Sequence, residues 1–436
     1  MLVQQRSVVT ILRRSVSASM FALVIALSAA TMLLSLVPAA HAQTFQVLHN
    51  FAGGDDGGEP RTGVVIDRAG NLYGTSWGGT SGYNGHVFKM THSGSSWTFT
   101  PLHEFGGSEG IEPVGITIGP DGNLYGVNLY GGGMGCEGNG CGTVFKVSPP
   151  AQSCADLNCP WPATVLYTFG GGSDGSYPWM DGVISDQEGN LYGTTSSSGG
   201  GGLGVAYELT HAGGTWTFNL LHTFVGYPGD GGYPTAPLML DNAGNLYGTT
   251  SLGGTANLGT VFQLSPSPSG WNETVLWSFP GTLDGWQPAG GVVFDSAGSL
   301  YGTTNRGGNE RSSEDCDGIG CGTVFELSPA GGGWTETVLH SFDLSNGDAW
   351  PYAGLTPDAA GNFYGTTAGY YPHSNGNVFK LTPSNGSWVY TSVHEFQEYD
   401  GMYPASTVAI DEDGNLYGTT TYGGAYGYGV VWELTP

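Results

Sequence analysis

Seven segments related to Gly-Asn-Leu-Tyr-Gly recur along the chain and constrain its fold more than any other feature. The tyrosines at their centres lie 52 to 67 residues apart, at Tyr73, Tyr125, Tyr192, Tyr247, Tyr301, Tyr364 and Tyr417. Units of about 50 residues that recur in this way are typical of propellers and solenoids, whose repeats bury their faces against their neighbours. The sequence therefore predicts a repeat architecture.

Each unit contains four short segments rich in Val, Tyr, Phe, Thr and Trp and bounded by Gly, Pro, Asn or Asp, which are strand signals. In the second unit the expected strands are Val114–Ile118, Asn123–Val127, Thr143–Val147 and Thr164–Phe169. Four antiparallel strands make one blade, so we predict an all-β, seven-bladed β-propeller spanning residues 43–436. An open β-solenoid is the alternative.

The chain ends favour the closed ring. Residues Thr44–Phe51 match the fourth strand of the unit, although they precede the first full unit. The last unit stops after Val430–Leu434, which is its third strand. We therefore expect the amino-terminal strand to complete the last blade, which removes a free sheet edge.

Residues 1–42 are expected to be a secretory signal peptide rather than part of the fold. They combine early positive charge, an apolar run and a small-x-small cleavage site, found respectively at Arg6, Arg13 and Arg14, at Met20–Val37 and at Ala40–Ala42. Cleavage before Gln43 would leave a secreted or periplasmic protein without a stable membrane span. Retention of the apolar run as an anchor is the alternative.

The formal net charge is −26, and three of the ten basic residues lie within the first 42. So acidic a surface repels nucleic acid and anionic lipid, which excludes both as partners. We expect a monomer. The 78 glycines fall at fixed offsets beside strand residues, so they mark turns rather than disorder.

The six cysteines form three pairs with four intervening residues, and an even number in an exported chain indicates disulfides. Pairing within each pair is expected, because a strand separates the second pair from the first by more than a disulfide can bridge. The predicted bridges are Cys136–Cys141, Cys154–Cys159 and Cys316–Cys321. Zinc binding by these cysteines is the weaker alternative.

The units resemble a known repeat. Segments such as Gly290–Thr304 and Gly322–Leu327 are similar to the GloVer tandem repeat of exported bacterial proteins and, more distantly, to NHL-type propeller blades. The resemblance covers Thr44–Pro436 and implies an extracytoplasmic propeller without a defined biochemical role.

Two sets of residues lie near the connections between blades and are candidates for ligand binding. An acid recurs in the Asp-Gly-x-x-Pro segments, and such acids could surround a mouth that attracts cations or calcium, or could simply build turns. Aromatic residues flank the same prolines and could stack on sugar rings, or could wedge between blades. The candidates are Asp174, Asp230, Asp284, Asp400, Trp179, Trp286, Trp350 and Tyr403.

A third set is expected to be structural. Histidine recurs in the fourth strand of most units, which suggests hydrogen-bonding spacers between blades, at His49, His103, His222, His340 and His394. The Asp-x-x-Gly-Asn turns lack the full pattern of a calcium loop and read as hairpin turns.

We therefore expect an exported binding module that recognises extracellular carbohydrate or a partner protein, without a cofactor apart from an optional structural calcium ion. No nucleophile motif occurs in the sequence, which favours a binding protein over an enzyme. One alternative is a polysaccharide lyase or a metal-dependent lactone hydrolase, for which the non-repeating acids Glu310, Glu314 and Asp315 are candidates. The other is a purely structural envelope protein.

Overall fold

The structure is a computed structural model that describes residues 43–78, 84–94, 96–150, 160–179, 182–197, 202–308, 315–344, 348–369 and 371–435. Contacts divide the chain into residues 1–44 with Pro436 and a second unit of residues 45–435, which is the propeller. The predicted signal peptide therefore lies outside the described residues. No helix in the described ranges has the length and hydropathy of a membrane span.

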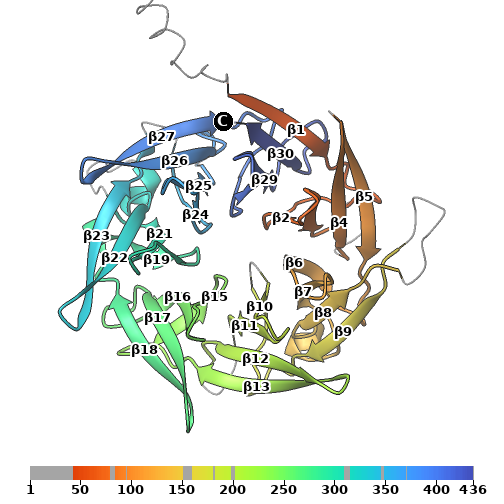
Figure 1. Ribbon diagram of the computed structural model, residues 1–436, viewed down its shortest axis with the longest axis horizontal. Coiled ribbons are helices and arrows are strands. Elements are labelled where there is room, and N and C mark those ends of the chain that lie inside the picture. The colour runs from red at the N-terminus through yellow and green to blue at the C-terminus, as the bar shows by residue number, and fades with distance from the viewer. Residues whose placement is uncertain are drawn as a thin grey trace, which may run out of the picture. The chain divides into compact units, whose positions relative to one another are not determined.

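The strands of the second unit form seven antiparallel sheets arranged as a ring (Figure 1). Blade 1 contains β2 (Val65–Ile66), β3 (Leu72–Ser76), β4 (His86–Ser93) and β5 (Ser96–Glu104). Blade 2 contains β6 (Ile111–Ile118), β7 (Leu124–Tyr130), β8 (Thr143–Val147) and β9 (Ala163–Thr168). Blade 3 contains β10 (Ile184–Ser185), β11 (Leu191–Thr195), β12 (Val205–Ala212) and β13 (Thr215–Thr223).

Blades 4 and 5 divide the innermost strand into two pieces that pair with the same neighbour. Blade 4 contains β14 (Gly231–Pro234), β15 (Met239–Leu240), β16 (Leu246–Gly253), β17 (Thr260–Ser267) and β18 (Gly270–Ser278). Blade 5 contains β19 (Trp286–Pro288), β20 (Val293–Phe294), β21 (Leu300–Arg306), β22 (Thr323–Ala330) and β23 (Gly333–Ser341).

Blade 6 contains β24 (Thr356–Pro357), β25 (Phe363–Thr367), β26 (Asn377–Ser384) and β27 (Ser387–Glu395). Blade 7 contains β28 (Ala409–Ile410), β29 (Leu416–Thr420), β30 (Val430–Thr435) and, from the other end of the chain, β1 (Thr44–Asn50). Short 3-10 turns occur at η1 (Cys136–Gly138), η2 (Thr282–Asp284) and η3 (Asp315–Gly318). The predicted seven-bladed propeller is confirmed, and the closed ring excludes the solenoid.

The chain ends meet as the sequence predicts. Strand β1 pairs with β30, so blade 7 has the order β1-β30-β29-β28 (Figure 1). The Phe51 amide donates to the Gly429 carbonyl at 3.0 Å, and Phe279 makes the same bond to Gly259 within blade 4. The closing blade therefore has the same internal geometry as the others, although its strands come from opposite ends of the chain.

The recurring tyrosine fixes the turn between the first two strands of each blade. In blade 1 the Tyr73 hydroxyl donates to Asp67 Oδ2 at 3.0 Å, and Asn71 Nδ2 donates to the same oxygen at 2.8 Å. The amides of Ala69 and Asn71 donate to Asp67 Oδ1. Burial alone would raise the pKa of Asp67, but these bonds outweigh it and lower that pKa. The carboxylate thus serves the turn, as the hairpin interpretation predicts.

The glycine that follows the tyrosine is required by packing. The aromatic ring of the third strand lies over this position, so a Cβ on Gly302 would lie 2.6 Å from Phe325 Cζ, and one on Gly74 would lie 2.5 Å from Phe88 Cζ. Phe88 and Phe325 are fully buried. The glycine therefore allows a large core ring to contact the sheet backbone directly.

We predict that Gly302→Ala destabilises the protein by about 1–3 kcal/mol, because the added methyl group overpacks against Phe325. Gly106→Ala is the matched control, since nothing lies within 4 Å of a Cβ there. Denaturant unfolding monitored by tryptophan fluorescence measures both. Equal stability of the two variants would contradict this role of the glycine.

Ring closure gives a second prediction. Phe51 is fully buried in the closing blade, as Phe279 is in blade 4. Because both rings occupy the same place in the repeat, Phe51→Ala and Phe279→Ala are each expected to cost about 3–5 kcal/mol. Denaturant unfolding compares them. A negligible effect of Phe51→Ala alone would show that the amino-terminal strand does not close the ring in solution.

Candidate functional site

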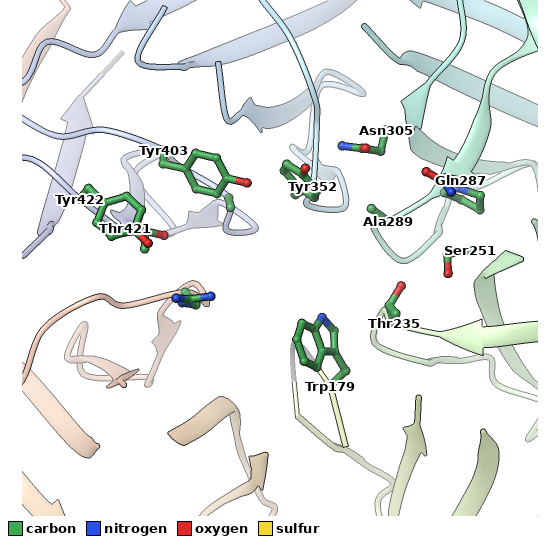
Figure 2. A pocket seen from close by; sticks show the side chains of 13 residues that line it. Trp179, Thr235, Ser251, Gln287, Ala289, Asn305, Tyr352, Tyr403, Thr421 and Tyr422 are labelled. Atoms are coloured by element: carbon green, nitrogen blue, oxygen red, sulfur yellow. The ribbon is translucent and has the colours of Figure 1, made fainter. Parts of the chain in front are cut away.

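A cavity of 610 Å³ lies at the centre of the ring and is the candidate site (Figure 2). Residues of six of the seven blades line it, at Arg61, Trp179, Thr235, Ser251, Gln287, Pro288, Ala289, Asn305, Tyr352, Tyr403, Ala405, Thr421 and Tyr422. Its size falls within the range of small-molecule sites, roughly 300–1,000 Å³. Aromatic and neutral polar residues make up most of the lining, together with Pro288, Ala289 and Ala405, and Arg61 is its charged member.

A backbone conformation that recurs in every blade directs side chains toward this cavity. A proline recurs in the connection that leads into each blade, and the residue before it has a positive φ, between 50° and 60°. These residues are Glu59, Glu112, Tyr177, Tyr233, Gln287, Trp350 and Tyr403. The amide of each donates to a loop carbonyl of the preceding blade, as Tyr233 does to Leu203 at 2.8 Å. A left-handed backbone is costly for large residues and is kept only where the surroundings impose it.

The proline itself contacts a glycine of the preceding blade. A Cβ on Gly204 would lie 2.9 Å from Pro234 Cδ, and one on Gly259 would lie 2.6 Å from Pro288 Cδ. The next residue along the chain then lines the cavity in six blades, at Arg61, Trp179, Thr235, Ala289, Tyr352 and Ala405. Neighbouring blades thus set the position of each of these side chains.

Aromatic rings form much of the wall. Tyr352 and Tyr403 have ring centroids 5.8 Å apart, and Tyr403 lies 6.3 Å from Tyr422. Figure 2 shows Trp179 on the opposite side of the opening from Tyr352 and Tyr403. The cavity therefore has aromatic rings on two opposite sides.

Polar groups lie between the rings. The Asn305 side chain is only 5% exposed, and its Nδ2 has no hydrogen-bond partner in the part of the chain that the structure describes. The equivalent residue of blade 4, Ser251, instead donates its hydroxyl to the Tyr233 carbonyl at 3.1 Å. A buried donor without a partner is unfavourable, so Asn305 presents an amide that a ligand acceptor would satisfy.

Arg61 is held in place by its own neighbours. Its guanidinium lies 3.6 Å from the Trp77 ring centroid, and its Nη2 contacts Glu59 Oε2 at 3.3 Å. Asp, Glu, His and Lys are absent from the described lining, so neither a carboxylate nor an imidazole stands ready there as a general acid or base. Burial and the neighbouring Tyr352 raise the pKa of Tyr403, which opposes its use as a base at neutral pH.

The predicted site residues divide between several places. Trp179 and Tyr403 line the central cavity, whereas Trp350 lines a smaller neighbouring hollow together with Tyr403. Trp286 packs against the core between blades 4 and 5. The four predicted acids, Asp174, Asp230, Asp284 and Asp400, do not line the central cavity.

Three of those acids accept bonds within the connecting turns. Asp174 accepts from the Gly170 amide at 2.7 Å, Asp230 from Val225 at 2.7 Å, and Asp400 from Gln397 at 2.7 Å. Strand histidines reach two of these carboxylates, since His222 lies 3.2 Å from Asp230 and His394 lies 3.4 Å from Asp400. In blade 2 the Tyr167 hydroxyl donates to Asp174 at 3.0 Å instead. The acids thus serve the outer part of the ring in these blades.

The expected spacer role of the histidines agrees with their contacts. His49 stacks on Phe99 of the next blade with centroids 3.9 Å apart, and its Nε2 lies 3.1 Å from Asp56 Oδ2. His394 stacks on Phe45 at 3.7 Å. His49 and His394 thus each join a turn acid to the outer strand of the following blade.

Two of the three predicted disulfides are present, at Cys136–Cys141 and Cys316–Cys321. The third, Cys154–Cys159, lies outside the described residues. So do Glu310, Glu314 and the side chain of Asp315, which the catalytic alternative invoked.

Asn305, Thr235, Ser251, Thr421 and Arg61 were not predicted as site residues. They occupy positions that vary from blade to blade within an otherwise regular unit. That variation was the available signal, because a position that only builds the blade keeps the same residue type.

A family model for the Gloeobacter/Verrucomicrobia repeat matches residues 32–179, 158–314 and 314–436. The chain belongs to this repeat family. The resemblance to the GloVer repeat is thereby confirmed. No curated protein matches the chain.

Several solved structures are similar to the chain at low sequence identity. An ulvan lyase bound to -[GlcA(1-4)Rha3S]- is 13% identical with a TM-score of 0.53, and the match covers 90% of this chain and 95% of that one. The polysaccharide lyase Uly1 is 12% identical with a TM-score of 0.49, covering 92% and 94%. The NanB sialidase of Streptococcus pneumoniae is 11% identical with a TM-score of 0.42, covering 92% and 72%.

The outer strands contain two glutamates that depart from the repeat. Glu336 on β23 occupies the place where Phe99 and Tyr390 stack in other blades. Burial and, secondarily, the charge of Asp284 raise the pKa of Glu336 to about 8. Because the native state then binds this proton more tightly than the unfolded chain, Glu336 destabilises the fold increasingly as pH rises from about 4.5 to 8.

We therefore predict that Glu336→Gln raises the melting temperature by about 1–2 °C at pH 8.5 and leaves it nearly unchanged at pH 4.5. Thermal unfolding of both proteins across this pH range measures the difference. A melting-temperature difference that stays constant with pH would contradict a titrating Glu336.

Proposed function

We propose that this protein is an exported, non-catalytic carbohydrate-binding propeller whose ligand occupies the central cavity. The observation that carries the proposal is that one concave site has aromatic rings on opposite sides, with Trp179 across from Tyr352 and Tyr403, and also contains the buried amide of Asn305, whose Nδ2 has no hydrogen-bond partner among the described residues. Sugar rings present apolar C–H faces to aromatic rings and hydroxyl groups to amides and hydroxyls.

The polar lining suits hydroxyl-rich ligands. Thr235, Ser251 and Thr421 offer hydroxyls, and Gln287 and Asn305 offer amides, all within the same wall. Such groups both donate and accept, as sugar hydroxyls do. The ulvan lyase shares the propeller fold, and its structure contains bound -[GlcA(1-4)Rha3S]-. At 13% identity that likeness concerns the fold, so the proposal rests on the cavity residues.

Binding is favoured over catalysis by the chemistry of the described lining. It contains no carboxylate or imidazole, and the pKa of Tyr403 moves away from that of a neutral-pH base. Export is proposed from the signal-like residues 1–42 and agrees with the two disulfides, which persist in oxidising compartments.

The test begins with a panel of neutral and acidic polysaccharides, followed by calorimetric titration of any oligosaccharide that binds. Trp179→Ala and Tyr352→Ala are each expected to weaken binding about 10-fold or more, since a lost stacking face costs on the order of 1–2 kcal/mol. Tyr399→Ala is the matched control, because Tyr399 is 75% exposed and does not line the cavity.

Two outcomes would overturn the proposal. One is the absence of any saccharide binding, or binding that Trp179→Ala and Tyr352→Ala leave unchanged. The other is turnover: new reducing ends or unsaturated products from a bound saccharide would establish an enzyme instead.

A further inference from the structure

The interface between blades 3 and 4 contains a cluster of three metal-ligating side chains that the central cavity does not involve. His222 lies on β13 of blade 3, Asp230 lies on the connection into blade 4, and Glu273 lies on β18 of blade 4. One ligand atom from each lies within 4.8 Å of the other two. All three side chains are partly buried.

Glu273 breaks the repeat at this place. The equivalent residue stacks as an aromatic ring on the preceding blade's histidine or tyrosine at four interfaces, through Phe45, Phe99, Phe218 and Tyr390. Blade 5 also has a glutamate, Glu336, and the charge of Asp284 acts on it. At the position of His222, however, blade 4 has Trp277 and so no histidine. Among the described residues, only the blade 3–4 interface brings three such ligands together.

The donor atoms are available. His222 Nε2 lies 3.2 Å from both oxygens of Asp230, and the Val225 amide occupies only Oδ2. Glu273 Oε1 is buried and has no hydrogen-bond partner within the described chain. Burial and the charge of Asp230 raise the pKa of Glu273 to about 7, a repulsion that a bound cation would remove.

The geometry suits a small ion with one nitrogen and two oxygen ligands. A tetrahedral ion with bonds of about 2.0–2.1 Å places its ligand atoms about 3.3 Å apart, close to the observed separation of His222 from Asp230. Imidazole together with carboxylates selects zinc-type ions over calcium or magnesium, which prefer oxygen alone. The side chains of His222 and Asp230 are 22% and 13% exposed, so an ion and a fourth, water ligand have access.

We propose that His222, Asp230 and Glu273 form a Zn²⁺ site that joins the outer strands of blades 3 and 4. The ion replaces the proton between His222 and Asp230 and provides the missing partner of Glu273 Oε1. It takes the place of the stacked ring that supports the equivalent interface in other blades. This proposal does not depend on the function of the central cavity.

The test uses the purified, untagged protein stripped with EDTA and titrated with ZnCl₂ by calorimetry, with bound metal measured after dialysis. One Zn²⁺ per chain is expected, together with a higher melting temperature in zinc. Glu273→Phe restores the residue type of three other blades and should fold, yet it should lower zinc affinity roughly 100-fold or more. Glu273→Gln should lower it as well while keeping the side-chain shape.

Glu336→Phe is the matched control, because it makes the same change at the equivalent position without a histidine beside it. It should bind zinc as the unmodified chain does. The proposal is overturned if the EDTA-stripped protein takes up no stoichiometric zinc. It is equally overturned if Glu273→Phe binds zinc as tightly as Glu336→Phe, since the ion would then lie elsewhere.

Discussion

Closure of the ring by the pairing of β1 with β30 is the constraint on which the rest of the structure depends. Each blade holds part of the next, because the residue before the proline donates its amide to the preceding blade and the proline packs on that blade's glycine. For blade 1 the preceding blade is blade 7, so the Glu59 amide bonds to the Tyr428 carbonyl at 2.8 Å. Arg61 reaches the central cavity only because the two ends of the chain meet.

The repeat separates the positions that build the blades from the positions that line the cavity. Constant positions form the turn bonds of Asp67 and Tyr73, the glycine under Phe88, and their equivalents. Variable positions occupy the cavity wall, where one blade supplies Trp179 and another Ala289. A ring of nearly equivalent units can therefore hold an asymmetric site without any change in its core, since function resides in residues placed on the fold.

The outer strands also combine residues that recur in most blades with a few that depart from the repeat. Histidines and turn acids repeat around the ring and are satisfied by one another and by stacked rings, as His49 is by Asp56 and Phe99. Such recurrence favours a structural cause. Glu273 departs from it beside an intact histidine–acid pair, and a buried carboxylate without a partner requires either a proton or a cation. In both the cavity and this interface, the residues that depart from the repeat are the ones to which we assign a proposed binding role.

The sequence by itself determined the number of blades, the strands within them, the paired ends and the local cysteine pairing, because all of these follow from short-range patterns repeated seven times. It also singled out Trp179 and Tyr403 as aromatic residues beside the prolines. Only the tertiary structure decided which side chains share one cavity: Asn305, Ser251 and Tyr352 come from three blades, and their convergence depends on the ring geometry. The same geometry placed the turn acids Asp174 and Asp230 away from that cavity, because a linear motif states the spacing of a residue along the chain but not the direction in which the folded blade points its side chain.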